Sequence, residues 1–371
     1  MNDSVRRDFP VVQEFNHLNS AMISPLPTPV MEAVRGYFDG RQDIPTIKPW
    51  LAKADEVRHQ VATLIGARFE EIGFAMSTAD GINLVASAID WRAGDNVVLD
   101  DLAYVSDFVL WQHYEQAYDI ELRIVQNQEG AVPVAAFARQ TDKRTRLISI
   151  SYVSHHNGYL HEIRNLADLA HAYGAYLYTD AIQAVGAIPI DVRADDVDVL
   201  ACGTYKWVFG PFGLAFLYVK EELLDCIPPN KFGFLQRQNF QGPFRDWPAH
   251  HTAKQYEYGT YNFGGIYEFG AGLDYIESIG LAHLSTHIVG LAHRIWDGLN
   301  ELGYRMYTPQ RNQTPIVTCF LEHADRVAAA LEEANISVTV REDHGEMRVS
   351  PGIFNVQEEV DAFLSCMAGV S

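Results

Sequence analysis

Positively charged residues are scarce in this chain. Among 371 residues, Lys and Arg total 28 against 48 Asp and Glu, which gives a formal net charge of −20. Nucleic acids and anionic membranes are both bound through clustered positive charge. We therefore expect neither as a partner, and an anionic ligand must be held by a local arrangement of hydrogen-bond donors.

Cysteines and long apolar runs are also few. None of the four cysteines belongs to a CxxC pair, so the sequence indicates neither a disulfide framework nor a zinc site. His283 and His287 are four residues apart, but no third ligand accompanies them, and no metal site is expected. The N-terminus lacks a signal-peptide core, and no later stretch is long and apolar enough to span a bilayer. The sequence thus predicts a cytoplasmic, reduced protein.

What the chain does have is the pattern of an α/β fold. Short apolar runs alternate with helical segments, which is typical of a mostly parallel sheet covered on both faces. The predicted strands are residues 96–100, 122–125, 146–153, 175–180, 197–202 and 213–219. The pattern changes after about Gly264. One long helical stretch at 265–302 comes first, and the predicted strands that follow it are fewer. The sequence predicts a large domain over 23–262 and a small α+β domain formed by 1–22 and 263–371.

Three chemical features fall at the ends of predicted strands or at the start of a helix. Asp180 ends the run AYLYTD, Lys206 follows VDVLAC, and Ser77–Asp80 opens a helix. A helix N-terminus attracts phosphate, a buried carboxylate keeps a pyridine nitrogen protonated, and a lysine can form a Schiff base and move protons. Singly, such a lysine is more often a surface residue and such an aspartate a turn residue. Together they match what pyridoxal 5′-phosphate needs.

In this order, the segments resemble the class V aminotransferase family of fold-type I pyridoxal-phosphate enzymes, which includes cysteine desulfurases and isopenicillin N epimerase-like proteins. The likeness is most specific in YTDAIQAVG and GTYKWVFGPFG. It extends over nearly the whole chain through HLNSAMISPLP, STADGINLVA, SYVSHHNG, YEYGTYNFGG and MRVSPGIFN. The resemblance implies a seven-stranded type of sheet in the large domain and a homodimer with shared active sites.

The resemblance also implies roles at matching positions. Lys206 would carry the cofactor, Asp180 would face its ring nitrogen, and Tyr104 would stack on the ring. Further cofactor contacts are implied at Thr78, Ala79, His155, Gln183, Thr204, Tyr205 and Thr260, the last reaching the neighbouring subunit's phosphate. Arg348 would clamp the substrate carboxylate with Asn19 and His155 nearby, although an interdomain salt bridge is the alternative for Arg348.

Several positions depart from the family pattern. Tyr104 stands where desulfurases have a stacking histidine, and His155 where many relatives have asparagine. Ala79 replaces a common threonine, and Gly203 a frequent serine. Desulfurases need a nucleophilic cysteine ahead of the arginine, but residues 337–348 read SVTVREDHGEMR. A persulfide mechanism is therefore not expected.

The same residues serve several reactions at the α-carbon of an amino acid. Delivery of the proton to the cofactor gives transamination, delivery to the opposite face of the α-carbon gives epimerisation, and a leaving group on the β-carbon gives elimination. We favour an aminotransferase, with a β-eliminating C–S lyase or an epimerase as alternatives. A non-catalytic member would have lost Lys206 or Asp180, and both are present.

Overall fold

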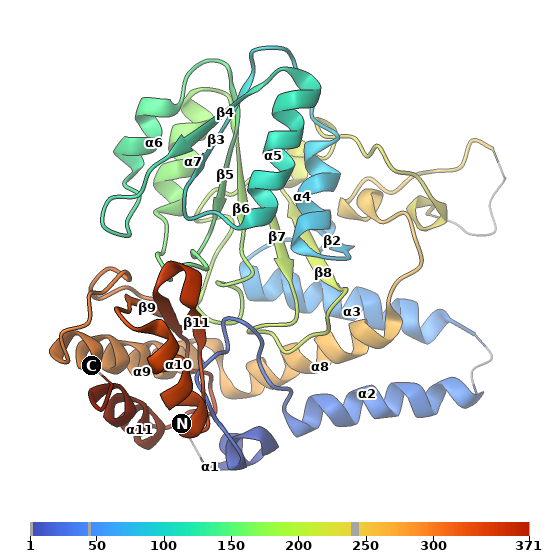
Figure 1. Ribbon diagram of the computed structural model, residues 1–371. Helices are drawn as coiled ribbons and strands as arrows, with labels where there is room; N and C mark the ends of the chain where they lie inside the picture. The colour runs from blue at the N-terminus through green and yellow to red at the C-terminus, as the bar shows by residue number, and fades with distance from the viewer. Residues whose placement is uncertain (1–2, 44–45, 239–244, 371) are drawn as a thin grey trace.

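Seven strands form the central sheet of the computed structural model, which describes residues 3–43, 46–238 and 245–370 (Figure 1). Their order across the sheet is β2 (Ile72–Ala75), β8 (Ala215–Val219), β7 (Val199–Gly203), β6 (Tyr176–Asp180), β5 (Thr145–Ser151), β3 (Asn96–Asp100) and β4 (Glu121–Val125). All neighbouring pairs from β7 to β4 are parallel, whereas β8 runs antiparallel to both β2 and β7. The predicted α/β fold with a mostly parallel, seven-stranded sheet is confirmed.

Helices cover both faces of this sheet, as Figure 1 shows. One face carries α4 (Thr78–Ala86) and α5 (Val105–Tyr118), which share an apolar core with the strands. The other face carries α3 (Lys48–Ile65), α6 (Val134–Gln140), α7 (Ile163–Ala172) and α8 (Phe263–Ile279). Adjacent strand residues alternate between the two cores, as Leu147 and Ile148 do. Such strands read as continuous apolar runs because both of their faces are buried.

Several elements differ from the sequence prediction. Strand β2 and helix α6 were not predicted, because IGFA and VAAFARQ are short runs without a decisive period. The long helical stretch at 265–302 is in fact two helices, α8 and α9 (Leu281–Glu301). Gly280 separates them with a φ of 87°, a left-handed value that ends α8 and that glycine adopts without steric cost.

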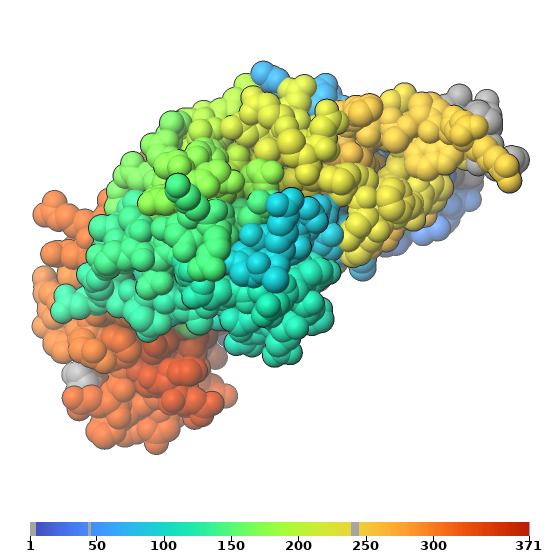
Figure 2. Space-filling model, turned by 90° about the horizontal axis from the view of Figure 1, so that it is seen from above, coloured from blue at the N-terminus to red at the C-terminus, as the bar shows by residue number. Residues whose placement is uncertain are grey.

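The C-terminal elements build a second, smaller layer around their own apolar cluster. A three-stranded antiparallel sheet contains β11 (Thr339–Arg341), β12 (Glu346–Val349) and β9 (Val317–Phe320), and it packs with α9, α10 (Ala324–Glu333) and α11 (Gln357–Ala368). Figure 2 shows these elements at one end of the molecule and the segment after β8 at the other.

The N-terminal segment joins both parts of the molecule. Strand β1 (Asn16–His17) pairs in parallel with β10 (Ile336–Ser337) beside the C-terminal layer. Two helices also belong to this segment, α1 (Asp3–Arg7) and α2 (Thr28–Gly40), and α2 packs along α8. The domain boundaries stay a prediction, and residues 1–2 and 371 of the predicted small domain lie outside the described residues. Within the described part of the chain, no helix is long and apolar enough to cross a bilayer.

Candidate active site

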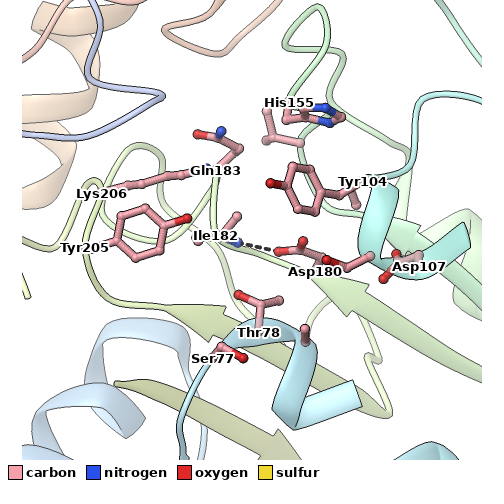
Figure 3. Close-up of a pocket in the computed structure, with 14 residues that line it drawn as sticks. Ser77, Thr78, Tyr104, Asp107, His155, Asp180, Ile182, Gln183, Tyr205 and Lys206 are labelled. Atoms are coloured by element: carbon pink, nitrogen blue, oxygen red, sulfur yellow. Dashed lines mark hydrogen bonds between the residues drawn. The ribbon is translucent and has the colours of Figure 1, made fainter. Parts of the chain in front are cut away.

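A cavity of about 210 Å³ lies where β3, β5, β6 and β7 reach their carboxyl ends (Figure 3). Parallel strands end at one edge of the sheet, so the loops that follow them supply side chains to a common site. The lining residues are Ser77, Thr78, Ala79, Tyr104, Ser106, Asp107, Ser151, Val153, His155, Asp180, Ile182, Gln183, Tyr205 and Lys206. Most of the residues predicted from the sequence are among them; Thr204, Thr260, Arg348 and Asn19 are not.

Lys206 is the one amine among the lining residues. It follows β7 and is 7% exposed. Its side-chain amine makes no hydrogen bond or ion pair within the described ranges, and its Nζ lies 5.6 Å from the centre of the Tyr205 ring. Burial lowers its pKa to about 8, with the Arg348 cation adding to the effect and the Asp180 carboxylate opposing it. At neutral pH roughly a tenth of a lysine with this pKa is the neutral, nucleophilic amine.

Asp180 is the last residue of β6 and is 5% exposed. One carboxylate oxygen accepts the backbone N–H of Ile182 at 3.0 Å, the dashed line in Figure 3. Burial raises its pKa from 3.8 to about 6, although that hydrogen bond and the Lys206 amine favour the charged form. A carboxylate that is costly to bury alone is well suited to pair with a cation that enters the cavity.

The start of α4 offers donors for an anion. The Ser77 hydroxyl oxygen caps the helix by accepting the N–H of Asp80 at 3.0 Å, while the N–H groups of Thr78 and Ala79 lack intrahelical partners. The Thr78 hydroxyl oxygen accepts the N–H of Gly203 at 2.9 Å, which leaves the hydroxyl proton free to donate. The free donors and the positive end of the helix dipole together suit a phosphate group.

Gly203 is closely surrounded by side chains that line the cavity. A Cβ at this position would lie 2.9 Å from Ile182 Cδ1 and 3.3 Å from Thr78 Oγ1. A larger residue at this position would therefore crowd two lining residues, whereas glycine leaves room for the Ile182 and Thr78 side chains.

Tyr104 and His155 lie close to each other at the side of the cavity, as Figure 3 shows. Tyr104 is the residue before α5, is 41% exposed, and meets the His155 ring edge to face at 4.8 Å between centroids. Burial first, and then the neighbouring charges of His156, Arg341 and Arg348, hold the pKa of His155 well below its ordinary value. His155 is therefore neutral at physiological pH and is a poor proton donor.

Gln183 and Tyr205 line the cavity, and both side chains also contact other residues of the chain. Gln183 donates its amide N–H to Ala21 O at 2.9 Å and accepts the indole N–H of Trp207, also at 2.9 Å. The Tyr205 ring stacks on Phe212 at 4.4 Å between centroids. Gln183 keeps one amide proton for a ligand, because its NH₂ group carries two.

Thr204 and Thr260 lie away from this cavity. The single proton of the Thr204 hydroxyl is within reach of two backbone carbonyls further along the chain, Pro211 O at 2.9 Å and Leu214 O at 3.0 Å, so this hydroxyl supports the lysine loop. Thr260 lines a separate cavity of about 190 Å³, together with Met76 and Asp80. Within its own chain, neither threonine is placed to hold a ligand beside Lys206.

Arg348 lies behind His155 on β12. Its guanidinium donates to His155 O at 2.8 Å and to the Thr339 hydroxyl at 3.4 Å, and that hydroxyl donates to Asn19 Oδ1 at 2.8 Å. It makes no ion pair with any described carboxylate, and its Nε is buried without a partner. Burial lowers the pKa of Arg348 to about 10, with Arg341 contributing. Because Arg348 has no carboxylate partner among the described residues, it does not form the interdomain salt bridge that is the alternative interpretation of this residue.

Sequence reasoning missed Asp107, Ser106 and Ser151 as lining residues. Asp107 is 3% exposed and lies in α5, one helical turn after Tyr104. Residues one turn apart share a helix face, so a polar residue at this spacing from a predicted site residue could have indicated it. Ser151 ends β5 as Asp180 ends β6, and the two are register partners in the sheet.

The matched family agrees with this geometry. The sequence profile described as Aminotransferase class-V matches residues 17–363. An uncharacterised aminotransferase of Bacillus subtilis is 28% identical, with 96% of this chain and 95% of that protein covered. A cysteine desulfurase of Escherichia coli is 31% identical, with 98% and 96% covered. An apo structure of a cysteine desulfurase from Thermococcus onnurineus is 28% identical, with a TM-score of 0.90 and 100% and 98% covered.

The chain belongs to the class V aminotransferase family, whose members are pyridoxal-phosphate enzymes. Its cofactor is pyridoxal 5′-phosphate. The residues present suit this cofactor, because the cavity combines an unpaired amine for the aldehyde, a buried carboxylate for the ring nitrogen and an open helix N-terminus for the phosphate. The reaction is a separate question, since relatives named after different reactions match about equally well.

Proposed function

We propose that the chain is an aminotransferase that acts on an amino acid. The observation that carries this proposal is the state of Lys206, a buried amine without a partner whose pKa falls to about 8. Transamination needs a single group that removes a proton at one atom and returns it at another. Among the lining side chains Lys206 is suited to that task, whereas His155 is held neutral by burial.

The other residues would bind and orient. When bound, pyridoxal 5′-phosphate supplies the electron sink that stabilises negative charge at the substrate's α-carbon. Asp180 would hold a proton on the ring nitrogen, and Thr78 and Ala79 would bind the phosphate. Arg348 would bind the substrate carboxylate, and Lys206 would then take the α-proton and return it.

The cysteines argue against a desulfurase. Residues 342–345 between β11 and β12 form a short turn without a thiol. Cys319 is fully buried in the C-terminal core, and burial raises its pKa to about 12. Cys202 is 1% exposed on β7, and burial holds the pKa of its thiol well above the ordinary value. Neither is a thiolate at neutral pH, and the thiolate is the reactive form.

A C–S lyase and an epimerase remain the alternatives. A lyase needs an acid for its leaving group, a demand that Lys206 would have to meet in addition to removing the α-proton. An epimerase needs a proton donor on the face opposite Lys206. In Figure 3, Tyr104 lies across the cavity from Lys206, so it is the residue to test for that reaction.

We further propose that the working unit is a homodimer. Thr260 lies in its own chain's second cavity rather than beside Lys206. Large apolar side chains are exposed near both cavities, including Met76 at 65%, Val105 at 60% and Phe212 at 64%. A second copy that covered them would bury this apolar area and bring its Thr260 to the phosphate site of the first.

A single-turnover experiment tests the reaction. The holoenzyme is mixed with one amino acid at a time in the absence of any keto acid. An aminotransferase forms one equivalent of keto acid per site, stops, and leaves the cofactor as pyridoxamine phosphate. Continuous release of ammonia would instead establish the lyase, and loss of optical activity without keto acid the epimerase. Lys206→Ala is the control that should form no product.

A further inference from the structure

Asp107 is a second buried carboxyl in the cavity that holds Asp180. It is the third residue of α5 and is 3% exposed, and its Oδ2 is buried without a hydrogen-bond partner among the described residues. Figure 3 shows its carboxyl group beside Asp180, on the α5 side of the cavity. The mechanism outlined above uses Asp180 and leaves Asp107 without a role.

The groups that face Asp107 are acidic or neutral. Strand β6 contributes Asp180 and Tyr178, and the Tyr178 hydroxyl is also buried without a partner. Asp100, at the end of β3, bonds to His161 at 3.0 Å. Strand β5 contributes only the hydroxyl of Ser151 to the cavity. Burial and then the Asp180 and Asp100 carboxylates raise the pKa of Asp107 well above its ordinary value, with no cation opposing them.

The N-terminus of α5 has the opposite effect, because it favours the charged form of Asp107. The helix dipole stabilises a carboxylate in the first turn of a helix, but only modestly. The cost of burying an uncompensated carboxylate is larger, so the helix alone does not keep Asp107 ionised. Asp180 differs from Asp107 because two groups favour its charged form. Its carboxylate accepts the Ile182 N–H at 3.0 Å, and it lies near the Lys206 amine. Of the two carboxyls, Asp180 is the better place for a negative charge.

We propose that Asp107 is the protonated member of this pair of carboxyls, and that it is therefore a positioning residue which confines the cavity's negative charge to Asp180. One anion then faces the one cationic ring nitrogen of the bound cofactor. A second carboxylate beside Asp180 would oppose the ionisation of Asp180, because like charges in one buried site disfavour each other's charged form. The neutral acid thus leaves Asp180 free to be the single anion of the cavity.

Infrared difference spectroscopy of the substrate-free holoenzyme tests this directly. At about pH 8, where an ordinary carboxyl is fully ionised, wild type should show the carbonyl stretch of a protonated carboxylic acid. Asp107→Asn should remove the band, and Asp180→Asn should keep it. Glu268→Gln is the matched control, because burial raises the pKa of the half-buried Glu268 to about 7 and this group contributes a band that fades as pH rises. Absence of the band from wild type, or its survival in Asp107→Asn, overturns the proposal.

Cofactor affinity gives a second readout that does not require turnover. Asn is neutral and nearly isosteric, so Asp107→Asn should change the dissociation constant of pyridoxal 5′-phosphate by less than about threefold, whereas Asp180→Asn should raise it by about tenfold or more. Equal losses in the two variants would mean that Asp107 is charged, and would refute the assignment. Wild-type infrared data decide the matter if a variant fails to fold. Neither measurement depends on which reaction the enzyme catalyses.

Discussion

Asp180→Asn is expected to stabilise the cofactor-free protein while it weakens cofactor binding. Asp180 is 5% exposed, and within the described chain its carboxylate has the Ile182 N–H as a partner but no ion pair. Asparagine keeps an oxygen that can accept this N–H and removes the charge. The substitution therefore isolates the free energy of burying the carboxylate.

The magnitude follows from the shift in protonation. Burial raises the pKa of Asp180 from 3.8 to about 6. Because each pKa unit corresponds to about 1.4 kcal/mol, the ionised carboxylate costs the folded protein about 3 kcal/mol above pH 6. Between about pH 4 and pH 6 the folded state binds this proton more tightly than the unfolded state, so stability falls as pH rises. Asparagine should gain about 2–3 kcal/mol at pH 7 and almost nothing below about pH 4.

Urea unfolding of the cofactor-free protein, followed by circular dichroism, measures this gain. Wild type and Asp180→Asn are compared at about pH 7 and about pH 4. Asp90→Asn serves as the control, because the Asp90 side chain is 84% exposed and its substitution should leave the free energy of unfolding unchanged at both pH values. The reasoning is refuted if Asp180→Asn is no more stable than wild type at neutral pH, or if the gain is the same at both pH values.

Three further substitutions test other contacts. Arg58→Met should destabilise the protein by about 3–5 kcal/mol in urea unfolding, since it leaves the buried Glu257 carboxylate, 2.7 Å from Arg58, without its cation. Arg348→Lys should raise KM for the amino acid by about 10–100-fold and change kcat less, because the planar fork that matches a carboxylate is lost. Thr78→Val should weaken cofactor binding about fivefold in a fluorescence titration, the value of one hydrogen bond of about 1 kcal/mol.

Each of these has its own control. Adding Glu257→Met to Arg58→Met should recover part of the lost stability, and a double variant no better than the sum would contradict the ion-pair account. A change in kcat alone for Arg348→Lys would remove this residue from substrate binding. Thr63 on α3 provides the matched control, Thr63→Val, because Thr63 does not line the cavity and its hydroxyl donates to His59 O within its own helix. It should leave cofactor affinity unchanged.

Local sequence patterns were sufficient for the layered fold. Apolar runs such as NVVLD and AYLYTD are short and buried on both faces, and the helical spacing between them is legible because it repeats every few residues. The same patterns placed Asp180 and Lys206 at strand ends, where the carboxyl edge of a sheet brings them together. They failed for IGFA, whose strand character comes from its pairing with β8 across the sheet.

The sequence by itself determined the family and the cofactor, because these depend on residue types in a fixed order, and it predicted the residues that would bear the chemistry. Only the tertiary structure decided which side chains meet. It brought Asp107 into the cavity of Asp180, left Arg348 without a counterion in the part of the chain that the structure describes, and put Thr260 into a different cavity from Lys206. These outcomes depend on burial and on contacts between distant segments, and burial is what sets the protonation states of the site.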